Sequence, residues 1–207
     1  LVGSEMCIRD SHHLAPNPGE DFQMFEKDLP GRGTKSFATS ADDIGNLPLE
    51  VCETINGSWG FNLKDRKHKS KKELVQYLVK AAGYDSNLLL NVGPMPNGRI
   101  QEEHIKSLKE IGEWLSLNGE TIYGTSIGPI NPADEIASTK KDSTIYIHLL
   151  NSNKTTYFIE GFNPKIKKIN YYKSNNKVKY EKTKSGLIIN VSDSEIDQID
   201  TIIKLEI

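Results

Sequence analysis

Three carboxylates and two aromatic residues fall within one short stretch of the sequence. They are Glu50, Glu53, Trp59, Phe61 and Asp65. Carboxyl groups donate and accept protons in catalysis, and glycoside hydrolysis in particular uses them in pairs. Carboxylates beside aromatic faces therefore favour a site that grips and protonates a sugar, although any one of these acids taken alone is more typical of a solvated surface group.

The composition of the chain argues against some classes of binding partner. With 26 basic and 28 acidic residues among 207, the net charge is −2, so no sequence-wide field attracts nucleic acid or an anionic membrane. A neutral sugar is compatible with this balance. No run of about 18 apolar residues is present, so no membrane span is expected. The two cysteines, Cys7 and Cys52, say little about compartment and do not indicate a disulfide.

The first part of the chain is irregular in sequence. Residues 1–11 show no periodicity, and we interpret them as a non-native scar joined to the reading frame, which removes Asp10 from the catalytic candidates. Residues 12–46 are polar and broken by proline and glycine, which predicts a long active-site loop anchored by Phe22 and Phe25.

The middle of the chain has the rhythm of helix, strand and helix. Ser70 and Glu73 have the spacing of a capping box, so a helix should begin there and end at Gly83. Residues 88–92 form a short apolar run, as expected for a strand covered on both faces of a parallel sheet. A second helix is predicted over residues 101–118. The apolar stripes expected on the two helices are Leu74, Val75, Leu78, Val79 and Ala82, and Ile105, Leu108, Ile111 and Leu115. This alternation is typical of a β/α barrel.

After Thr125 the helical pattern stops and strand-like runs follow. The predicted strands are 144–150, 156–160, 166–172, 187–191 and 201–207. Polar turn residues separate them, which predicts an antiparallel β-sandwich. The pair Tyr171 and Tyr172 could stack on a sugar, but sheet packing is the more usual role of aromatic residues in strands.

Three blocks carry a resemblance to a known family. They are residues 47–65 (LPLEVCETINGSWGFNLKD), 86–94 (SNLLLNVGP) and 112–125 (GEWLSLNGETIYGT). In this order, from about Gly19 to Thr125, the chain resembles the α-L-fucosidases of glycoside hydrolase family 29. The likeness covers only the back part of such an enzyme. It implies retaining hydrolysis of a terminal α-L-fucose without metal or cofactor, with a nucleophilic Asp that lies upstream of the recognisable sequence and is missing from this chain.

The resemblance also implies roles for the carboxylates. Asp65 is the first candidate for the catalytic acid/base, because related enzymes place an acid a few residues beyond a Ser-Trp-Gly-Tyr-type block, in which Phe61 here replaces the tyrosine. We expect Lys64 to face away from Asp65, since a general acid needs a raised pKa and a neighbouring cation lowers it. Glu53 is the alternative catalytic residue, at a position that contacts sugar in related enzymes. Glu50 is expected to be structural, holding a backbone amide or an arginine.

Fucose carries a methyl group at C5, so a fucose site is expected to place apolar side chains, an apolar wall, against that methyl group. Trp59 and Leu88 are the candidates for that wall, with Phe61 as a further substrate-binding residue; ordinary strand core is the alternative role for Leu88.

The sequence thus predicts an α/β plus all-β chain. Residues 12–125 would form the last units of a (β/α)8 TIM-like barrel, and residues 126–207 a C-terminal antiparallel β-sandwich. The expected partner is a fucosylated oligosaccharide or glycoconjugate. The rival interpretation is a non-catalytic carbohydrate-binding or structural module in which the acids only hold loops. The oligomeric state is open, as is the compartment, for which family habit suggests secretion or the periplasm.

Overall fold

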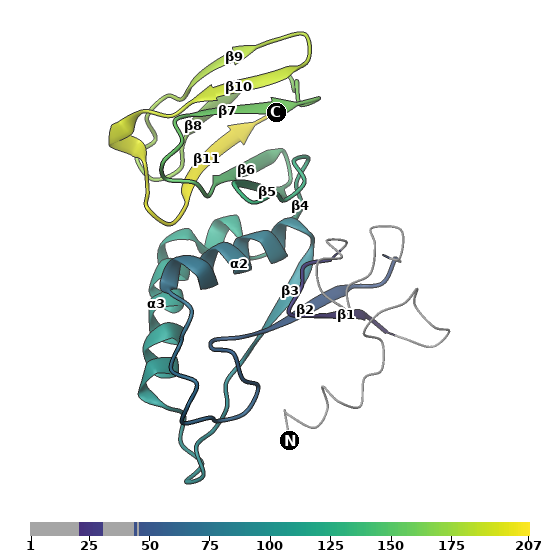
Figure 1. Cartoon of the computed structure of the whole chain (residues 1–207). Helices are drawn as coiled ribbons and strands as arrows, with labels where there is room; N and C mark the ends of the chain where they lie inside the picture. The colour runs from purple at the N-terminus through teal and green to yellow at the C-terminus, as the bar shows by residue number, and fades with distance from the viewer. Residues whose placement is uncertain (1–20, 31–43, 45) are drawn as a thin grey trace. The chain divides into compact units, whose positions relative to one another are not determined.

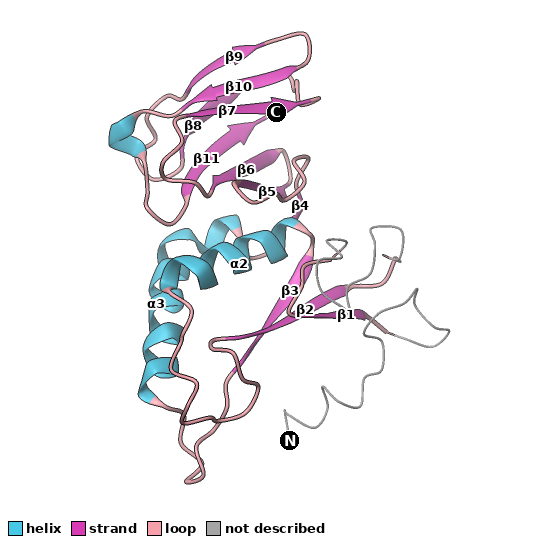
Figure 2. Cartoon of the chain, viewed as in Figure 1, coloured by secondary structure: helices cyan, strands magenta, loops and turns pink. Residues whose placement is uncertain are grey.

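The computed structural model describes residues 21–30, 44 and 46–207. Its contacts divide the chain into two compact units. The described part of the first unit lies within Leu1–Lys69 and Tyr84–Leu108, and the second unit comprises Ser70–Gly83 and Lys109–Ile207. The chain is mixed α and β, with most of its strands in the second unit (Figures 1 and 2).

The first unit is built on three parallel strands, β1 (Gln23–Glu26), β2 (Leu49–Thr54) and β3 (Ser86–Asn91), in the order β1-β2-β3. The register pairs Phe25 with Val51, and Val51 with Leu88. Phe25 and Val51 are buried, as is the free thiol of Cys52, whose pKa burial raises to about 11. The parallel strand predicted around residues 88–92 is therefore confirmed.

Two expectations about these strands are wrong. Residues 23–26 are a strand and not loop, because they pair with β2, a long-range interaction that a four-residue run does not reveal. The three leucines of β3 are half-buried and not covered on both faces, since β3 has only β2 as a neighbour among the described residues. The remaining predicted loop residues, 31–43 and 45, and the predicted scar at 1–11 lie outside the described residues.

Helix α2 (Lys71–Gly83) begins at the predicted capping box. The Ser70 N–H and Oγ both donate to Glu73 Oε2, over 2.8 and 2.7 Å, and the Glu73 N–H donates back to Ser70 Oγ over 3.2 Å. The two bonds made by the backbone N–H groups of Ser70 and Glu73 satisfy donors that the start of the helix leaves without a backbone partner. The buried stripe differs slightly from the prediction: Ala81 is buried, whereas Leu78 and Ala82 are half-buried.

Helix α3 (Glu102–Asn118) and the 3-10 turn η2 (Gly119–Thr121) confirm the second predicted helix and its end. The predicted apolar stripe is wrong in part, because Leu108 is exposed and Leu115 half-buried. The buried positions of α3 are His104, Ser107, Ile111, Trp114 and Asn118. Polar residues take inward positions there, and Asn118 and Ser107 satisfy part of their polar groups by donating to the carbonyls of Trp114 and Glu103.

The second unit contains two antiparallel sheets (Figure 1). One has the order β4-β5-β6-β11-β8 and the other β7-β10-β9. The bounds are β4 Ser126–Ile127, β5 Ile136–Lys141, β6 Thr144–Leu149, β7 Thr156–Glu160, β8 Lys168–Tyr171, β9 Lys179–Lys182, β10 Gly186–Asn190 and β11 Thr201–Glu206. All five predicted strands are present within one or two residues. Strands β4, β5 and β9 were not predicted, because they are short or rich in polar residues.

The two antiparallel sheets share one hydrophobic core. Its fully buried members alternate along the strands, as Ile145, Ile147 and Leu149 do on β6. Tyr171 belongs to this core at 3 % exposure, and its hydroxyl accepts a hydrogen bond from the Ser192 N–H over 3.0 Å. The packing interpretation of the tyrosine pair therefore holds for Tyr171.

A cluster around Glu120 ties η2 to the five-stranded sheet. The Glu120 carboxylate accepts from the Tyr146 hydroxyl over 2.5 Å, from Lys204 Nζ over 3.0 Å and from the Tyr172 hydroxyl over 3.3 Å. The hydrogen bonds from Tyr146 and Lys204 hold the pKa of Glu120 below its usual range. The Thr139 hydroxyl on β5 also donates to the Thr121 carbonyl. The end of the Gly112–Thr125 block therefore has a structural role, because it attaches η2 to the sheet.

Candidate active site

The carboxyl ends of the three parallel strands bring together residues that are distant in sequence. Because β1, β2 and β3 run in the same direction, Glu26, Thr54 and Asn91 all lie at one edge of the sheet. The loop after β2, residues 55–69, starts from this edge. In α/β folds the carboxyl edge of a parallel sheet is where ligands bind. The candidate site is therefore built on this edge.

Trp59 is fixed by contacts to the ends of both neighbouring strands. Its Nε1 donates to Glu26 Oε1 over 3.0 Å, and its carbonyl accepts from Asn91 Nδ2 over 2.7 Å. Lys27 Nζ lies 4.8 Å from the centre of the ring and donates to the Gly57 carbonyl over 2.9 Å. Lys27 thus covers one face of the half-buried indole by a cation–π contact. A ligand that stacks on Trp59 would use the other face.

The loop around Trp59 approaches the end of β3 very closely at Gly93. A Cβ atom added to Gly93 would lie 2.6 Å from the carbonyl carbon of Gly60 and from the nitrogen of Phe61. Only glycine allows this approach without movement of the backbone. The close contact positions Phe61, which is half-buried, against the segment that follows β3.

Asp65 is held as an ionised carboxylate in this structure. The Ser58 hydroxyl, together with the backbone N–H groups of Ser58, Gly57 and Lys67, lowers its pKa below the usual range. Its Oδ2 lies only 3.1 Å from the position that a Cβ on Gly57 would take. A general acid needs a raised pKa, whereas a general base needs the ionised form. The hydrogen bonds around Asp65 therefore suit a base.

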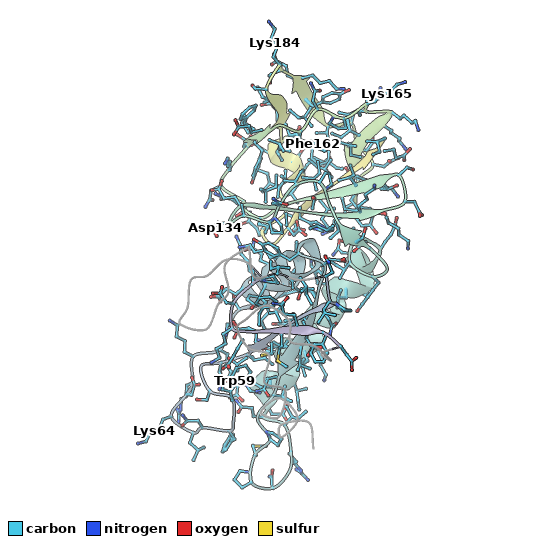
Figure 3. The ribbon with its side chains drawn as sticks, turned by 90° about the vertical axis from the view of Figure 1, so that its right-hand side faces the viewer. Trp59, Lys64, Asp134, Phe162, Lys165 and Lys184 are labelled. Carbon is cyan, nitrogen blue, oxygen red and sulfur yellow. The ribbon has the colours of Figure 1, made fainter. Side chains whose placement is uncertain are left out.

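Lys64 faces away from Asp65, as expected. Its side chain is exposed and points out from the loop in Figure 3, while its backbone N–H donates to Asn62 Oδ1 over 3.0 Å. It does not contribute to the lowered pKa of Asp65, whose causes are hydrogen bonds.

Glu53 is buried, at 5 % exposure, and paired. Its Oε1 lies 3.3 Å from Lys69 Nζ and accepts from the Thr54 N–H over 2.7 Å and from Thr54 Oγ1 over 3.3 Å. Lys69 also donates to the Thr54 carbonyl over 2.6 Å. A buried charge is tolerated when it is paired and hydrogen-bonded in this way.

Glu50 and Leu88 lie further from the carboxyl edge. Glu50 Oε2 accepts from Asn87 Nδ2 over 2.9 Å, so it has the structural role that was expected, with an asparagine of the next strand as partner. Leu88 pairs with Val51 in the middle of the strands. Leu90, on the same face as Leu88, is level with Glu53 and nearer the edge.

Sequence reasoning missed Glu26, Lys27, His68, Lys69 and His104. The available signal for Glu26 was a carboxylate directly after the short apolar run Phe22–Phe25. Its assignment to a loop hid that signal, because a residue at the carboxyl end of a strand is a site candidate and a residue in the middle of a loop is not. The histidines gave no signal, since their proximity depends on how the loop folds against the start of α3.

The described residues contain neither a cluster of metal-ligating side chains nor a membrane-spanning helix. No group of three or more His, Cys, Asp or Glu residues in that part of the chain could hold a metal ion. No helix within it is long and apolar enough to cross a membrane.

Comparisons with known proteins agree on one family. The family profile described as Alpha-L-fucosidase matches residues 2–120. The α-L-fucosidase of Dictyostelium discoideum is 37% identical over 97 residues, which are 44% of this chain and 21% of that protein. The human tissue α-L-fucosidase is 33% identical over 105 residues, covering 47% of this chain and 22% of that protein.

Solved structures give the same result over more of the chain. The α-L-fucosidase isoenzyme 1 from Paenibacillus thiaminolyticus aligns with a TM-score of 0.74 and 28% identity, over 90% of this chain and 45% of that one. The α-fucosidase of Thermotoga maritima, in complex with a mechanism-based inhibitor, aligns with a TM-score of 0.75 and 25% identity, over 92% and 44%. The chain thus spans about a fifth of the length of these curated relatives and under half of these solved structures.

Proposed function

Because this chain belongs to the α-L-fucosidase family, we propose that it forms part of an exo-acting retaining glycoside hydrolase that releases terminal α-L-fucose from glycans or glycoconjugates. In this proposal the three parallel strands and their helices are the last units of a (β/α)8 barrel. The two antiparallel sheets are then a C-terminal β-sandwich. The carrying observation is the loop from Trp59 to Asp65, which rises from the carboxyl edge of the parallel strands.

Asp65 is the proposed acid/base. In a retaining mechanism one carboxylate attacks the anomeric carbon while a second protonates the leaving oxygen, and the second then takes a proton from the water that releases the sugar. The hydrogen bonds that lower the pKa of Asp65 favour its ionised form, which suits that last step. For the first step its pKa must be raised, and the negative charge of a nucleophile about 5 Å away acts in that direction.

Glu53 is the alternative acid/base. Its carboxylate is buried and engaged by Lys69 and Thr54, so to protonate a leaving group it would have to exchange these donors for the substrate. Asp65 is half-buried as a residue, and its Oδ2, which is buried, has no hydrogen-bond partner among the described residues. This difference supports Asp65 over Glu53.

Trp59 and Leu88 remain the proposed apolar wall for the C5 methyl group, with Phe61 beside them. Trp59 has the firmer support, since Glu26 holds its indole and Asn91 holds its backbone carbonyl. Replacing Leu88 by alanine should lower the ratio of kcat/KM for aryl α-L-fucoside over aryl α-L-galactoside, on the scale of about 1 to 3 kcal/mol for one small apolar contact. An unchanged ratio with lower thermal stability would make Leu88 ordinary strand core.

A non-catalytic carbohydrate-binding or structural module is the second candidate. The observation that favours it is that Asp65, Glu53 and Glu50 all have protein partners, as acids that only hold loops would. It differs from the enzyme in needing no nucleophile.

Hydrolysis of an aryl α-L-fucoside separates the two. We expect the complete product of the gene that encodes this chain to turn it over. The 207-residue chain alone should show no turnover above a mock preparation, because in this proposal the nucleophilic Asp is not among its residues. Turnover by the 207-residue chain would contradict the partial-site account. Fucoside binding without turnover by the complete product would favour the module.

A further inference from the structure

His104 is a buried histidine that makes no hydrogen bond to any described residue. It is 2 % exposed, and neither Nδ1 nor Nε2 has a partner within the described part of the chain. It lies in the first turn of α3, where the positive end of the helix dipole disfavours a second positive charge. Burial, and then the neighbouring His68, lower its pKa, against a smaller opposite effect of Glu103 and Asp65. His104 is therefore neutral at physiological pH.

His68 meets His104 edge to face. The ring centres are 5.4 Å apart and the planes are inclined by 79°, which is a favourable aromatic geometry. On its other side, His68 Nε2 lies 3.0 Å from Gln101 Nε2. Because the amide nitrogen of Gln101 can only donate, His68 Nε2 must accept, so His68 is the neutral tautomer with its proton on Nδ1. Protonated His68 would place two donors opposite each other.

The position of His68 in the chain connects this contact to both candidate carboxylates. Its neighbour Lys67 supplies a backbone N–H to Asp65. Its other neighbour, Lys69, pairs with Glu53 over 3.3 Å, and the Lys69 backbone N–H donates to the Ile55 carbonyl over 2.7 Å. A movement of His68 would therefore disturb the hydrogen bonds of Asp65 and Glu53 together.

We propose that His68, Gln101 and His104 form a clamp that positions the loop carrying Asp65, and that protonation of the two histidines opens it and sets the acid limit of the activity. The three are positioning residues that act through Lys67 and Lys69. The link to activity rests on the proposed function of Asp65, whereas the clamp itself does not.

The charges around the clamp fix the direction of the effect. Asp65 on the loop and Glu103 on α3 are the ionisable groups that face His104 besides His68. With His104 neutral and the Gln101 amide donating to His68, the loop is closed. As the pH falls, a charge on His68 repels Gln101, and a charge on His104 is opposed by burial and by the helix terminus. The loop then opens, and the hydrogen bonds that hold Asp65 are lost.

The tautomers can be measured on the 207-residue chain without any variant. Nitrogen-15 spectra of the histidine rings should show His68 with a proton on Nδ1 only. They should also show His104 neutral to a pH below about 6.5, the ordinary histidine value. His68 protonated on Nε2, or His104 titrating at or above that value, would overturn the clamp. This arm is independent of activity, so it also stands if the complete gene product proves not to be a fucosidase.

Variants of the complete gene product test the link to activity. His104→Phe keeps the ring contact with His68 and the hydrogen bond between His68 and Gln101, but it cannot be protonated, so the acid limb of kcat/KM should move to lower pH by about one unit. Lys64→Met is the matched control, since it removes a charge from the same loop without touching the clamp, and its profile should be that of the wild type. An unchanged acid limb in His104→Phe would contradict the role in activity. Should that variant not fold, His104→Met, which also cannot be protonated, gives the same test.

Discussion

Each unit buries a histidine, and these two histidines, His148 and His104, are held by different contacts. In the second unit, buried His148 is paired: its Nδ1 lies 2.7 Å from Oδ2 of Asp200, and both side chains are fully buried. In the first unit, buried His104 has no hydrogen-bond partner among the residues that the structure describes, and it packs against His68. The apolar surroundings also differ, because Leu187, Ile203 and Leu205 in the second unit are fully buried whereas the leucines of β3 are half-exposed. The second unit thus has a fully buried apolar core, whereas the first unit has partly exposed strands, and the candidate site lies at the ends of those strands.

Substitution of the two buried histidines, His148 and His104, gives the largest expected difference in the free energy of unfolding. His148→Phe leaves the Asp200 carboxylate buried without its partner, and removing one member of a buried pair costs about 3 to 5 kcal/mol. His104→Phe removes two unpaired ring nitrogens and should change the free energy of unfolding by less than about 1 kcal/mol. Urea unfolding followed by circular dichroism measures both.

The control for this pair is the double variant His148→Phe with Asp200→Asn, which removes the stranded charge and should recover part of the loss. Equal losses in the two single variants would contradict the comparison.

Core leucines give the next largest effect. Leu205→Ala should cost about 2 to 5 kcal/mol, since Leu205 is fully buried in the core shared by the two antiparallel sheets. Leu89→Ala on β3 should cost about 1 kcal/mol, because a half-exposed side chain loses less apolar contact. Hydrogen exchange of the strand amides would report each unit separately. A larger loss for Leu89 would show that β3 is better covered than its exposure indicates.

The capping box of α2 is worth less. Ser70→Ala removes the hydroxyl that caps Glu73 and should cost about 1 kcal/mol. Glu73→Gln is the control, because glutamine also accepts from the Ser70 N–H. Thermal unfolding of the two variants gives the comparison, and a Ser70→Ala variant as stable as wild type would show that the cap is replaced by water.

Acidification should produce the smallest effect and distinguish the units by pH. The folded-state pKa of His104 is lowered, so its contribution to stability is present above about pH 6.5 and is lost as the pH falls through the folded value. The folded-state pKa of Glu120 is also lowered, and its contribution is lost only below about pH 4.3. The Glu120 effect is small because the carboxylate is partly exposed to solvent. Hydrogen exchange at pH 7, 5.5 and 4 should show loosening first at the start of α3; simultaneous loosening of η2 would contradict this order.

Local rules predicted much of this fold. Ser70 and Glu73 placed the start of α2, and strand-like runs separated by polar turn residues placed β6, β7, β10 and β11, because caps and turns depend on neighbours in sequence. Long-range pairing escaped them. Strand β1 exists because β2 lies beside it, and the inward face of α3 takes His104, Ser107 and Asn118 because other groups surround those positions.

The candidate site was predictable in its residue types and not in its contacts. Asp65, Glu53 and Trp59 were chosen from the sequence, and they do lie on or just beyond the end of β2. Their contacts depend on the conformation of the 55–69 loop. In that conformation Ser58 lowers the pKa of Asp65, Lys69 forms an ion pair with Glu53, and Glu26 accepts a hydrogen bond from the indole of Trp59. No spacing rule gives that conformation.

The most direct test of the account is the leaving-group dependence of Asp65→Asn in the complete gene product. A general acid contributes about 10² to 10⁴-fold, and chiefly for poor leaving groups. Asp65→Asn should therefore slow the hydrolysis of fucosides with poor leaving groups by that factor, slow activated aryl fucosides much less, and be rescued on the latter by azide. Glu53→Gln should show neither the selective loss nor the rescue. Equal losses on both substrates for Asp65→Asn, with azide rescue only in Glu53→Gln, would contradict the account and assign the acid/base to Glu53.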